Sequence, residues 1–230
     1  MVHHLNPGGQ QFRGDRGAAD PGVTAALAAY QAGQGSEQAA LTALAGARLL
    51  VPVVAVLADG VATQGDKDSE MVLPTLIGRD GRPAVLAFTS LDALARWRPV
   101  ARPVPARAGR VWRGAVADGC AVVIDVAGPV PLAIEGARLA ALAAGQPVPA
   151  PHEDPDVRAE VQAAIAAEPA IAGFSLAPAR EDGPDLAVTL HLAKQARASQ
   201  AGPAVNRAAE GIAARLGTRL RRGIEVIVAR

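Results

Sequence analysis

The stretch KDSEMVLPTLIGRDGRPAVLAFTSLDALARW, residues 67–97, decides the fold of this chain. It contains two apolar, β-prone runs at residues 71–77 and 84–88, separated by the polar segment 78–82. That segment includes Asp80-Gly81, a pair that favours a tight turn between antiparallel strands. The stretch therefore predicts a β-hairpin, and its charged entry at residues 66–70 is more polar than a sheet core requires.

The segments around the hairpin predict a sheet flanked by helices. Ser90 is placed to cap a helix over residues 91–97, which must end before Pro99. The prolines at 103 and 105 make residues 101–105 extended. The remaining predicted elements are helices at 24–31, 36–45, 106–118 and 135–144, a central strand at 48–58, and a second hairpin formed by 120–126 and 130–134.

A Pro-rich segment at residues 147–151 is the best candidate for a linker between domains. Beyond it the sequence predicts a helix (154–168), two strands (171–176 and 186–192), a helix (203–220) and a strand (223–228). The predicted fold class is α+β: a domain at 21–146 with a mixed β-sheet flanked by helices, and a smaller αββαβ ferredoxin-like unit at 152–230. Residues 1–20, rich in glycine, are expected to form a flexible tail.

Composition favours a cytoplasmic protein without a membrane span. The longest apolar run, residues 49–58, is shorter than the ~20 residues that a spanning helix needs. Residues 1–20 lack the basic-then-apolar pattern of a signal peptide. The formal net charge of +1 gives no strong field toward nucleic acid or anionic lipid. The single cysteine, Cys120, is expected to be a small buried hydrophobe.

Motifs for catalysis, cofactors and metals are not found in the sequence. It lacks a Gly-x-Ser-x-Gly elbow and both common phosphate-binding glycine patterns. The four histidines (3, 4, 152 and 191) form no spaced metal-ligand pattern. The acidic segment at 152–156 is better explained as a helix start, with Asp154 as N-cap and Pro155 in the first turn. We therefore expect no enzyme activity, no cofactor and no metal site.

Several short motifs identify a family. They are Lys67-x-Ser69-x-Met71, Phe-Thr-Ser at 88–90, Trp97, and Ala-Arg-Pro-Val-Pro at 101–105. With these, the chain resembles the N-terminal domain of the SseB family, named for enhanced serine sensitivity and common in actinobacteria. The resemblance extends over about residues 20–229. It implies the α+β fold and an uncharacterised protein without a known chemical role.

The same motifs suggest a binding patch made of Lys67, Ser69, Glu70, Trp97 and Arg102. In this hypothesis Trp97 anchors an unknown protein partner, and Arg102 or Lys67 supplies a charged contact. A structural interpretation is preferred for Trp97 itself, in which its ring packs against the extended segment 101–105. The function expected first is therefore a protein-interaction or adaptor module.

Two other functions stay open as alternatives. Arg215, Arg219 and Arg222 could form one face of the predicted helix and bind RNA or the ribosome. This is not favoured, because the net charge is near neutral and no base-stacking aromatic residue follows Phe174. The third alternative is an enzyme acting on a small amino-acid-like substrate, with Lys67 and Glu70 as an acid/base pair.

Overall fold

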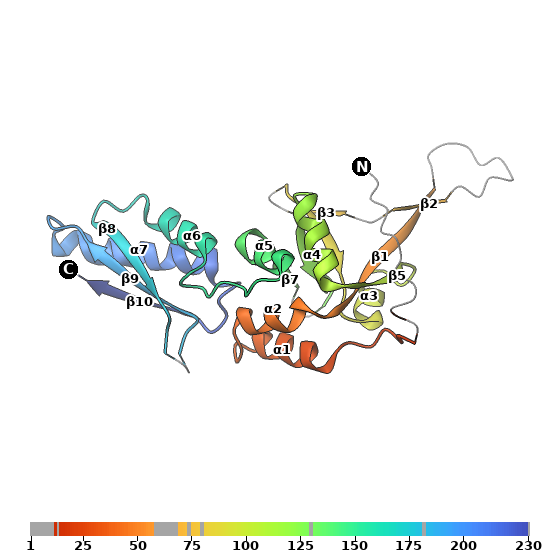
Figure 1. The fold of residues 1–230 in the computed structure, drawn as a ribbon. Coiled ribbons are helices and arrows are strands. Elements are labelled where there is room, and N and C mark those ends of the chain that lie inside the picture. Colours follow the sequence, from red (N-terminus) through yellow and green to blue (C-terminus); the bar gives the residue numbers. More distant parts are fainter. Residues whose placement is uncertain are drawn as a thin grey trace. The chain divides into compact units, whose positions relative to one another are not determined.

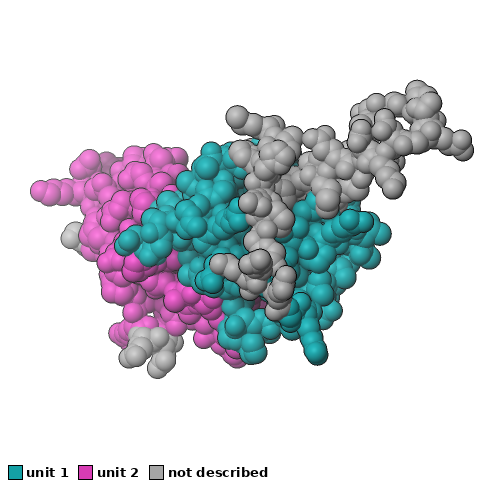
Figure 2. Space-filling model, turned by 45° about the vertical axis from the view of Figure 1, so that its right-hand side comes forward, with its two compact units in different colours: residues 1–24, 44–146 teal, residues 25–43, 147–230 magenta. Residues whose placement is uncertain are grey.

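The computed structural model describes residues 12, 14–57, 69–72, 75–78, 81–128, 131–180 and 183–229. The described chain forms two compact units, shown in Figures 1 and 2: unit 1 from residues 1–24 and 44–146, and unit 2 from residues 25–43 and 147–230. The elements are α1 (Pro21–Gln31), α2 (Glu37–Ala45), β1 (Arg48–Leu57), β2 (Ser69–Val72), β3 (Thr75–Ile77), β4 (Pro83–Ala87), α3 (Leu91–Trp97), β5 (Arg102–Arg107), α4 (Ala108–Ala117), β6 (Ala121–Ile124), β7 (Leu132–Ile134), α5 (Gly136–Ala144), α6 (Pro155–Ile165), β8 (Ile171–Ala177), β9 (Leu186–Leu192), α7 (Ala198–Leu216) and β10 (Ile224–Ala229).

Unit 1 contains two small sheets joined at one point. The first has the order β2-β1-β5, and both ladders are antiparallel. The second has the order β3-β4-β6-β7, in which only the β4–β6 ladder is parallel. Leu50 in β1 exchanges two 2.8 Å backbone hydrogen bonds with Phe88, the residue after β4. The predicted mixed sheet flanked by helices is thus confirmed, although its strands are divided between two sheets.

The predicted strand over residues 71–77 is wrong as a single element. Its first part belongs to β2, which pairs with β1, whereas β3 pairs with β4. The predicted hairpin survives as the β3–β4 pair, with Leu76 opposite Ala84. The reason for the division is the choice of partner strand: each part pairs with a different strand, and the local apolar pattern does not specify which one.

Beside α3, unit 1 has a hydrophobic cluster of six buried residues. Leu50, Leu86, Phe88, Ala93, Leu94 and Ala101 are buried in one cluster. These residues come from β1, from β4 and the residue that follows it, from α3, and from the segment before β5. The cluster therefore fixes α3 and the start of β5 relative to the two sheets.

Unit 2 contains the predicted αββαβ order as α6, β8, β9, α7 and β10. Its sheet has the order β10-β9-β8, with β10 parallel and β8 antiparallel to β9. Helices α6 and α7 pack against each other and against this sheet (Figure 1). Val157, Val161 and Ile165 recur every four residues along α6 and are all buried in the core, as the amphipathic pattern predicts.

Helix α7 begins earlier and ends earlier than predicted. It runs from Ala198 to Leu216 with Pro203 inside it, rather than from residue 203 to residue 220. Ala204, Ala208, Ile212 and Leu216 are its buried stripe. The predicted last turn, residues 217–220, is therefore not part of the helix, and the basic residues in and after it lie in the connection to β10.

Residues 25–43 belong to unit 2, whereas the predicted domain boundary placed them with residues 21–146. The reason is visible in their contacts. The Tyr30 hydroxyl donates to the backbone carbonyls of Thr218 (3.3 Å) and Arg219 (2.9 Å), and the Gln38 amide donates to the carbonyl of Val148 (2.9 Å). The boundary between the units thus falls inside α1 and inside α2.

Part of the predicted flexible tail lies within the described residues. The Asp15 carboxylate pairs with the Arg48 guanidinium at 2.8 Å, and the Gly17 carbonyl accepts a 2.8 Å hydrogen bond from the Leu91 N–H. Residues 1–11 and 13 are outside the described residues, so the tail as a whole stays a prediction. No helix in the described ranges is long and apolar enough to cross a membrane.

Candidate functional site

The residues of the predicted binding patch are placed by three different elements. Ser69 and Glu70 lie in β2, opposite Leu57 and Val56 of β1. Arg102 begins β5 on the other side of β1, opposite Val53. Trp97 ends α3. Lys67 lies outside the described residues. Trp97 and Arg102 are connected by the short segment 98–101, whereas Ser69 and Glu70 are neighbours in a separate strand.

Helix α3 is fixed at its start by local hydrogen bonds. The Ser90 hydroxyl accepts a 3.0 Å hydrogen bond from the Ala93 N–H, which confirms Ser90 as the N-cap. The preceding residue, Thr89, donates its backbone N–H (2.9 Å) and its hydroxyl (2.7 Å) to the two carboxylate oxygens of Asp125. Asp125 therefore connects the end of β6 to the start of α3.

Trp97 is half-buried at the end of this helix. Its ring packs on that of Phe88, with centroids 5.6 Å apart and planes inclined by 33°. The Arg98 guanidinium lies over the indole, 5.3 Å from the ring centroid. Trp97 also packs against the cluster that contains Ala101. Phe88 is a contact of Trp97 that the sequence did not indicate. Packing of the ring along the whole segment 101–105 stays a prediction.

The segment after Trp97 forms a tight turn. The Ala101 N–H donates a 3.1 Å hydrogen bond to the Arg98 carbonyl, which closes a β-turn with Pro99 and Val100 at its centre. Ala101 is only 8% exposed, whereas Val100 at the tip is 84% exposed. Arg98 and Arg102 flank the turn, and both are exposed. We call Trp97, Arg98, Val100 and Arg102 the turn surface.

Asp125 combines an unusual backbone conformation with a perturbed pKa. Its φ of 48° is the left-handed region, which Asp and Asn tolerate better than other side chains. Burial raises the pKa of the Asp125 carboxyl, although the hydrogen bonds from Thr89 and the charge of Arg96 act in the opposite direction. The folded protein therefore favours the protonated form of Asp125 relative to an exposed aspartate.

This pKa predicts a pH-dependent difference between the wild-type chain and Asp125→Asn. Because the folded pKa is raised, the contribution of Asp125 to stability is fully present below its unfolded pKa and is lost as pH rises through the folded pKa. Asparagine cannot titrate in this way. Urea unfolding from acid to neutral pH should therefore show the wild type losing stability relative to Asp125→Asn. A difference that stays constant with pH would contradict this assignment.

The three arginines of the predicted nucleic-acid face do not share a helix. Arg215 is in α7, whereas Arg219 and Arg222 lie in the connection that follows it. Each has a carboxylate partner: Arg215 pairs with Glu160 at 2.9 Å, Arg222 with Asp185 at 2.9 Å, and Arg219 with Glu37 at 2.6 Å. Their charges are therefore balanced inside unit 2, and they form no continuous basic helix face.

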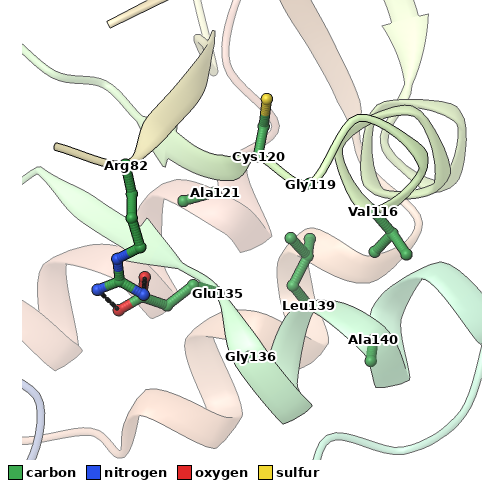
Figure 3. A pocket seen from close by; sticks show the side chains of 9 residues that line it. All are labelled: Arg82, Val116, Gly119, Cys120, Ala121, Glu135, Gly136, Leu139 and Ala140. Atoms are coloured by element: carbon green, nitrogen blue, oxygen red, sulfur yellow. Dashed lines mark hydrogen bonds and ion pairs between the residues drawn. The ribbon is translucent and has the colours of Figure 1, made fainter. Parts of the chain in front are cut away.

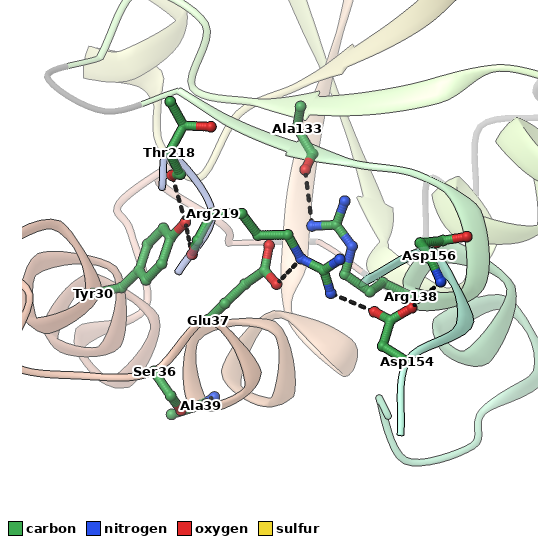
Figure 4. A network of polar contacts seen from close by, with 10 residues as sticks. All are labelled: Tyr30, Ser36, Glu37, Ala39, Ala133, Arg138, Asp154, Asp156, Thr218 and Arg219. Atoms are coloured by element: carbon green, nitrogen blue, oxygen red, sulfur yellow. Dashed lines mark hydrogen bonds and ion pairs between the residues drawn. The ribbon is translucent and has the colours of Figure 1, made fainter. Parts of the chain in front are cut away.

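Arg219 is the centre of a buried network that the sequence did not indicate (Figure 4). Its guanidinium contacts Glu37 of α2 and Asp154, the N-cap of α6. The side chains of Glu37 and Asp154 are 4% and 0% exposed, and that of Arg219 is 13% exposed. Burial would lower the pKa of Arg219, but Glu37 and Asp154 outweigh it, so its pKa is raised. The predicted cap at Asp154 is confirmed, since Asp154 accepts from the Asp156 N–H at 2.8 Å.

Cys120 is not the buried hydrophobe that the sequence suggested. It precedes β6, is partly exposed, and lines a cavity of about 250 Å³ (Figure 3). Burial and the nearby Asp118 charge raise the pKa of its thiol, which keeps the sulfur protonated and weakly nucleophilic at neutral pH. Arg82 and Glu135, also in this cavity, neutralise each other at 2.8 Å.

A second cavity, of about 420 Å³, lies beside the first turns of α7 in unit 2. Its charged groups are Glu168 and Arg207, joined by two hydrogen bonds of 2.8 Å each. The Arg207 guanidinium and the Glu168 carboxylate therefore bind each other rather than a ligand in this cavity. Over the described part of the chain, no group of three or more His, Cys, Asp or Glu side chains is placed to hold a metal ion.

Together, these elements define an α+β protein in which the exposed turn surface stands beside a well-packed core. The family model of the SseB protein N-terminal domain matches residues 23–141, more than half of the 230-residue chain. The chain belongs to the SseB family, as its sequence motifs predicted. No curated protein and no solved structure matched it. The matched range includes the whole turn surface and also residues 25–43 of unit 2.

Proposed function

We propose that this SseB-family protein is a non-catalytic cytoplasmic interaction module, an adaptor that binds a protein partner at the turn surface. The observation that supports the proposal most directly is Val100, an apolar β-branched side chain that is 84% exposed at the tip of a hydrogen-bonded turn. Turn positions usually carry polar residues or glycine. An apolar side chain held in solvent by a rigid turn binds a partner with little loss of conformational entropy.

Trp97 has a supporting role in this proposal, unlike the anchor role first assigned to it. Its ring is already in contact with Phe88 on one side and with Arg98. Removing the ring would loosen the core as well as the surface. Val100 instead has almost no contact to lose within the protein, which makes it the cleaner probe of partner binding.

The alternatives have less support. For RNA binding, the carboxylate partners of Arg215, Arg219 and Arg222 remove the unbalanced positive charge that phosphate contacts require. For an enzyme with an acid/base pair, Lys67 lies outside the described residues, so its distance from Glu70 supports neither outcome. In each of the two cavities described above, the acidic side chain already forms an ion pair with an arginine: Glu135 with Arg82, and Glu168 with Arg207.

Val100→Asp tests the adaptor proposal. The substitution should change the free energy of unfolding by no more than about 0.5 kcal/mol, as for an ordinary surface position. It should weaken partner binding by about tenfold or more, because a charge replaces an apolar anchor. A photo-cross-linking amino acid at position 100 would capture the partner in cells, and a pull-down with Val100→Asp would measure the loss.

Val116 provides the matched control. It is an exposed valine (47%) on α4, in the same unit but outside the turn surface. Val116→Asp should leave partner recovery unchanged, and a cross-linker at position 116 should not capture the same protein. Equal recovery with wild-type, Val100→Asp and Val116→Asp chains would refute the proposal.

A further inference from the structure

The turn surface also carries information about the chemistry of its partner. We infer that the partner segment is acidic, with an apolar side chain that meets Val100 and with Asp or Glu residues on both sides of it. This inference rests on the proposed function, since it concerns the same surface. It is carried by the charges of Arg98 and Arg102, which lie on either side of the exposed valine.

Arg98 carries an exposed guanidinium beside the turn. Its Cζ atom lies over the Trp97 ring, 5.3 Å from the ring centroid, in a cation–π contact, and the rest of the side chain faces solvent. A guanidinium edge offers parallel N–H donors that match the two oxygens of a carboxylate. The cation–π contact with Trp97 also restricts the Arg98 side chain, so that less conformational entropy is lost when an ion pair forms.

The position of Arg102 is fixed by the pairing of its backbone in the sheet, and its side chain is exposed. It is the first residue of β5, paired with Val53 of β1, and it follows the buried Ala101. Within the described part of the chain, neither Arg98 nor Arg102 forms an ion pair with a carboxylate. Both cations of the turn surface are therefore available to an acidic segment.

Other anionic partners fit the turn surface less well. Single-stranded nucleic acid uses open aromatic faces for base stacking, and the indole of Trp97 is occupied by Phe88 and Arg98. Binding to an anionic membrane needs a broad apolar face, whereas the turn tip presents only the two small exposed apolar side chains of Pro99 and Val100. A protein segment requires only an apolar contact and a few carboxylates, which is what this surface accommodates.

To test this inference, short random peptides displayed on phage are selected for binding to the purified full-length protein. Peptides that also bind the Val100→Asp variant are removed. The enriched peptides should carry Asp or Glu on both sides of an aliphatic or aromatic residue. Fluorescence anisotropy of an enriched peptide should show about two- to fivefold weaker binding for each of Arg98→Glu and Arg102→Glu, and a further loss at high salt. Arg113→Glu on α4, also an exposed arginine, should bind like the wild type.

The outcomes separate this inference from the proposed function. Enrichment of neutral or basic peptides that still depend on Val100 would overturn the acidic partner and leave the docking surface in place. The absence of any Val100-dependent peptide would overturn both. Displacement of the peptide by labelled single-stranded RNA or by phosphatidylserine vesicles, with tighter binding than the peptide itself, would replace the protein segment by that class of ligand.

Discussion

Replacing Arg219 with leucine is expected to lower the free energy of unfolding of unit 2 by about 3–5 kcal/mol. The substitution leaves the carboxylates of Glu37 and Asp154 buried without the guanidinium that both contact. A buried charge without a partner is far more costly than the loss of the attraction itself. Hydrogen exchange followed by mass spectrometry would measure the effect, because it reports the stability of unit 2 and unit 1 separately.

Arg215→Leu is the matched control for Arg219→Leu. Arg215 also pairs with a glutamate, Glu160, but the two side chains are 45% and 44% exposed. Exposed ion pairs contribute about 0–1 kcal/mol, so the amide hydrogens of unit 2 should exchange nearly as slowly in this variant as in the wild type. An equal loss of unit 2 stability in the two variants would show that the buried network around Arg219 contributes no more than an exposed ion pair.

Phe88→Ala is expected to destabilise unit 1 by about 3–5 kcal/mol, the usual cost of removing a fully buried phenylalanine ring. Phe88 is 0% exposed and belongs to the cluster that fixes α3. Its backbone bonds to Leu50 do not depend on the side chain, so the loss reports packing alone. Urea unfolding followed by tryptophan fluorescence is suitable, because both tryptophans, Trp97 and Trp112, are in unit 1.

The same substitution should also alter the turn surface, since the Phe88 ring supports that of Trp97. The near-ultraviolet circular dichroism of the indole should therefore decrease in Phe88→Ala under conditions where unit 1 is still folded. Leu91→Ala, at a position that is 39% exposed, should cost about 1 kcal/mol or less and leave the indole signal unchanged. A Phe88→Ala protein as stable as the wild type would show that the ring is not a major part of the core.

Local signals in the sequence were enough to predict most of the elements. Ser90 and Asp154 are N-caps as expected, and Gly145 ends α5 in the left-handed conformation (φ 68°). These features depend on a few neighbouring residues. The division of residues 71–77 between two sheets depends instead on which strand each part meets, and neither partner strand can be read from the local pattern.

The candidate site was predicted only in part, for a related reason. Trp97 and Arg102 were proposed because they belong to family motifs, whereas Val100 was missed because it belongs to none of them. A proline followed by a β-branched residue, between two arginines, was the available indication of an apolar turn tip. The partners of Arg219 were out of reach, since Glu37 lies 182 residues away in the chain.

That separation along the chain has a consequence for synthesis on the ribosome. At about 5–20 residues per second, Arg219 is made roughly 9–36 s after Glu37. During this interval α1 and α2 leave the ribosome before Arg219 has been made. They therefore lack the carbonyl that accepts from Tyr30 and the guanidinium that pairs with Glu37. Unit 2 therefore completes its folding only after Arg219 has been translated, and its residues 25–43 are exposed to chaperones and proteases until then.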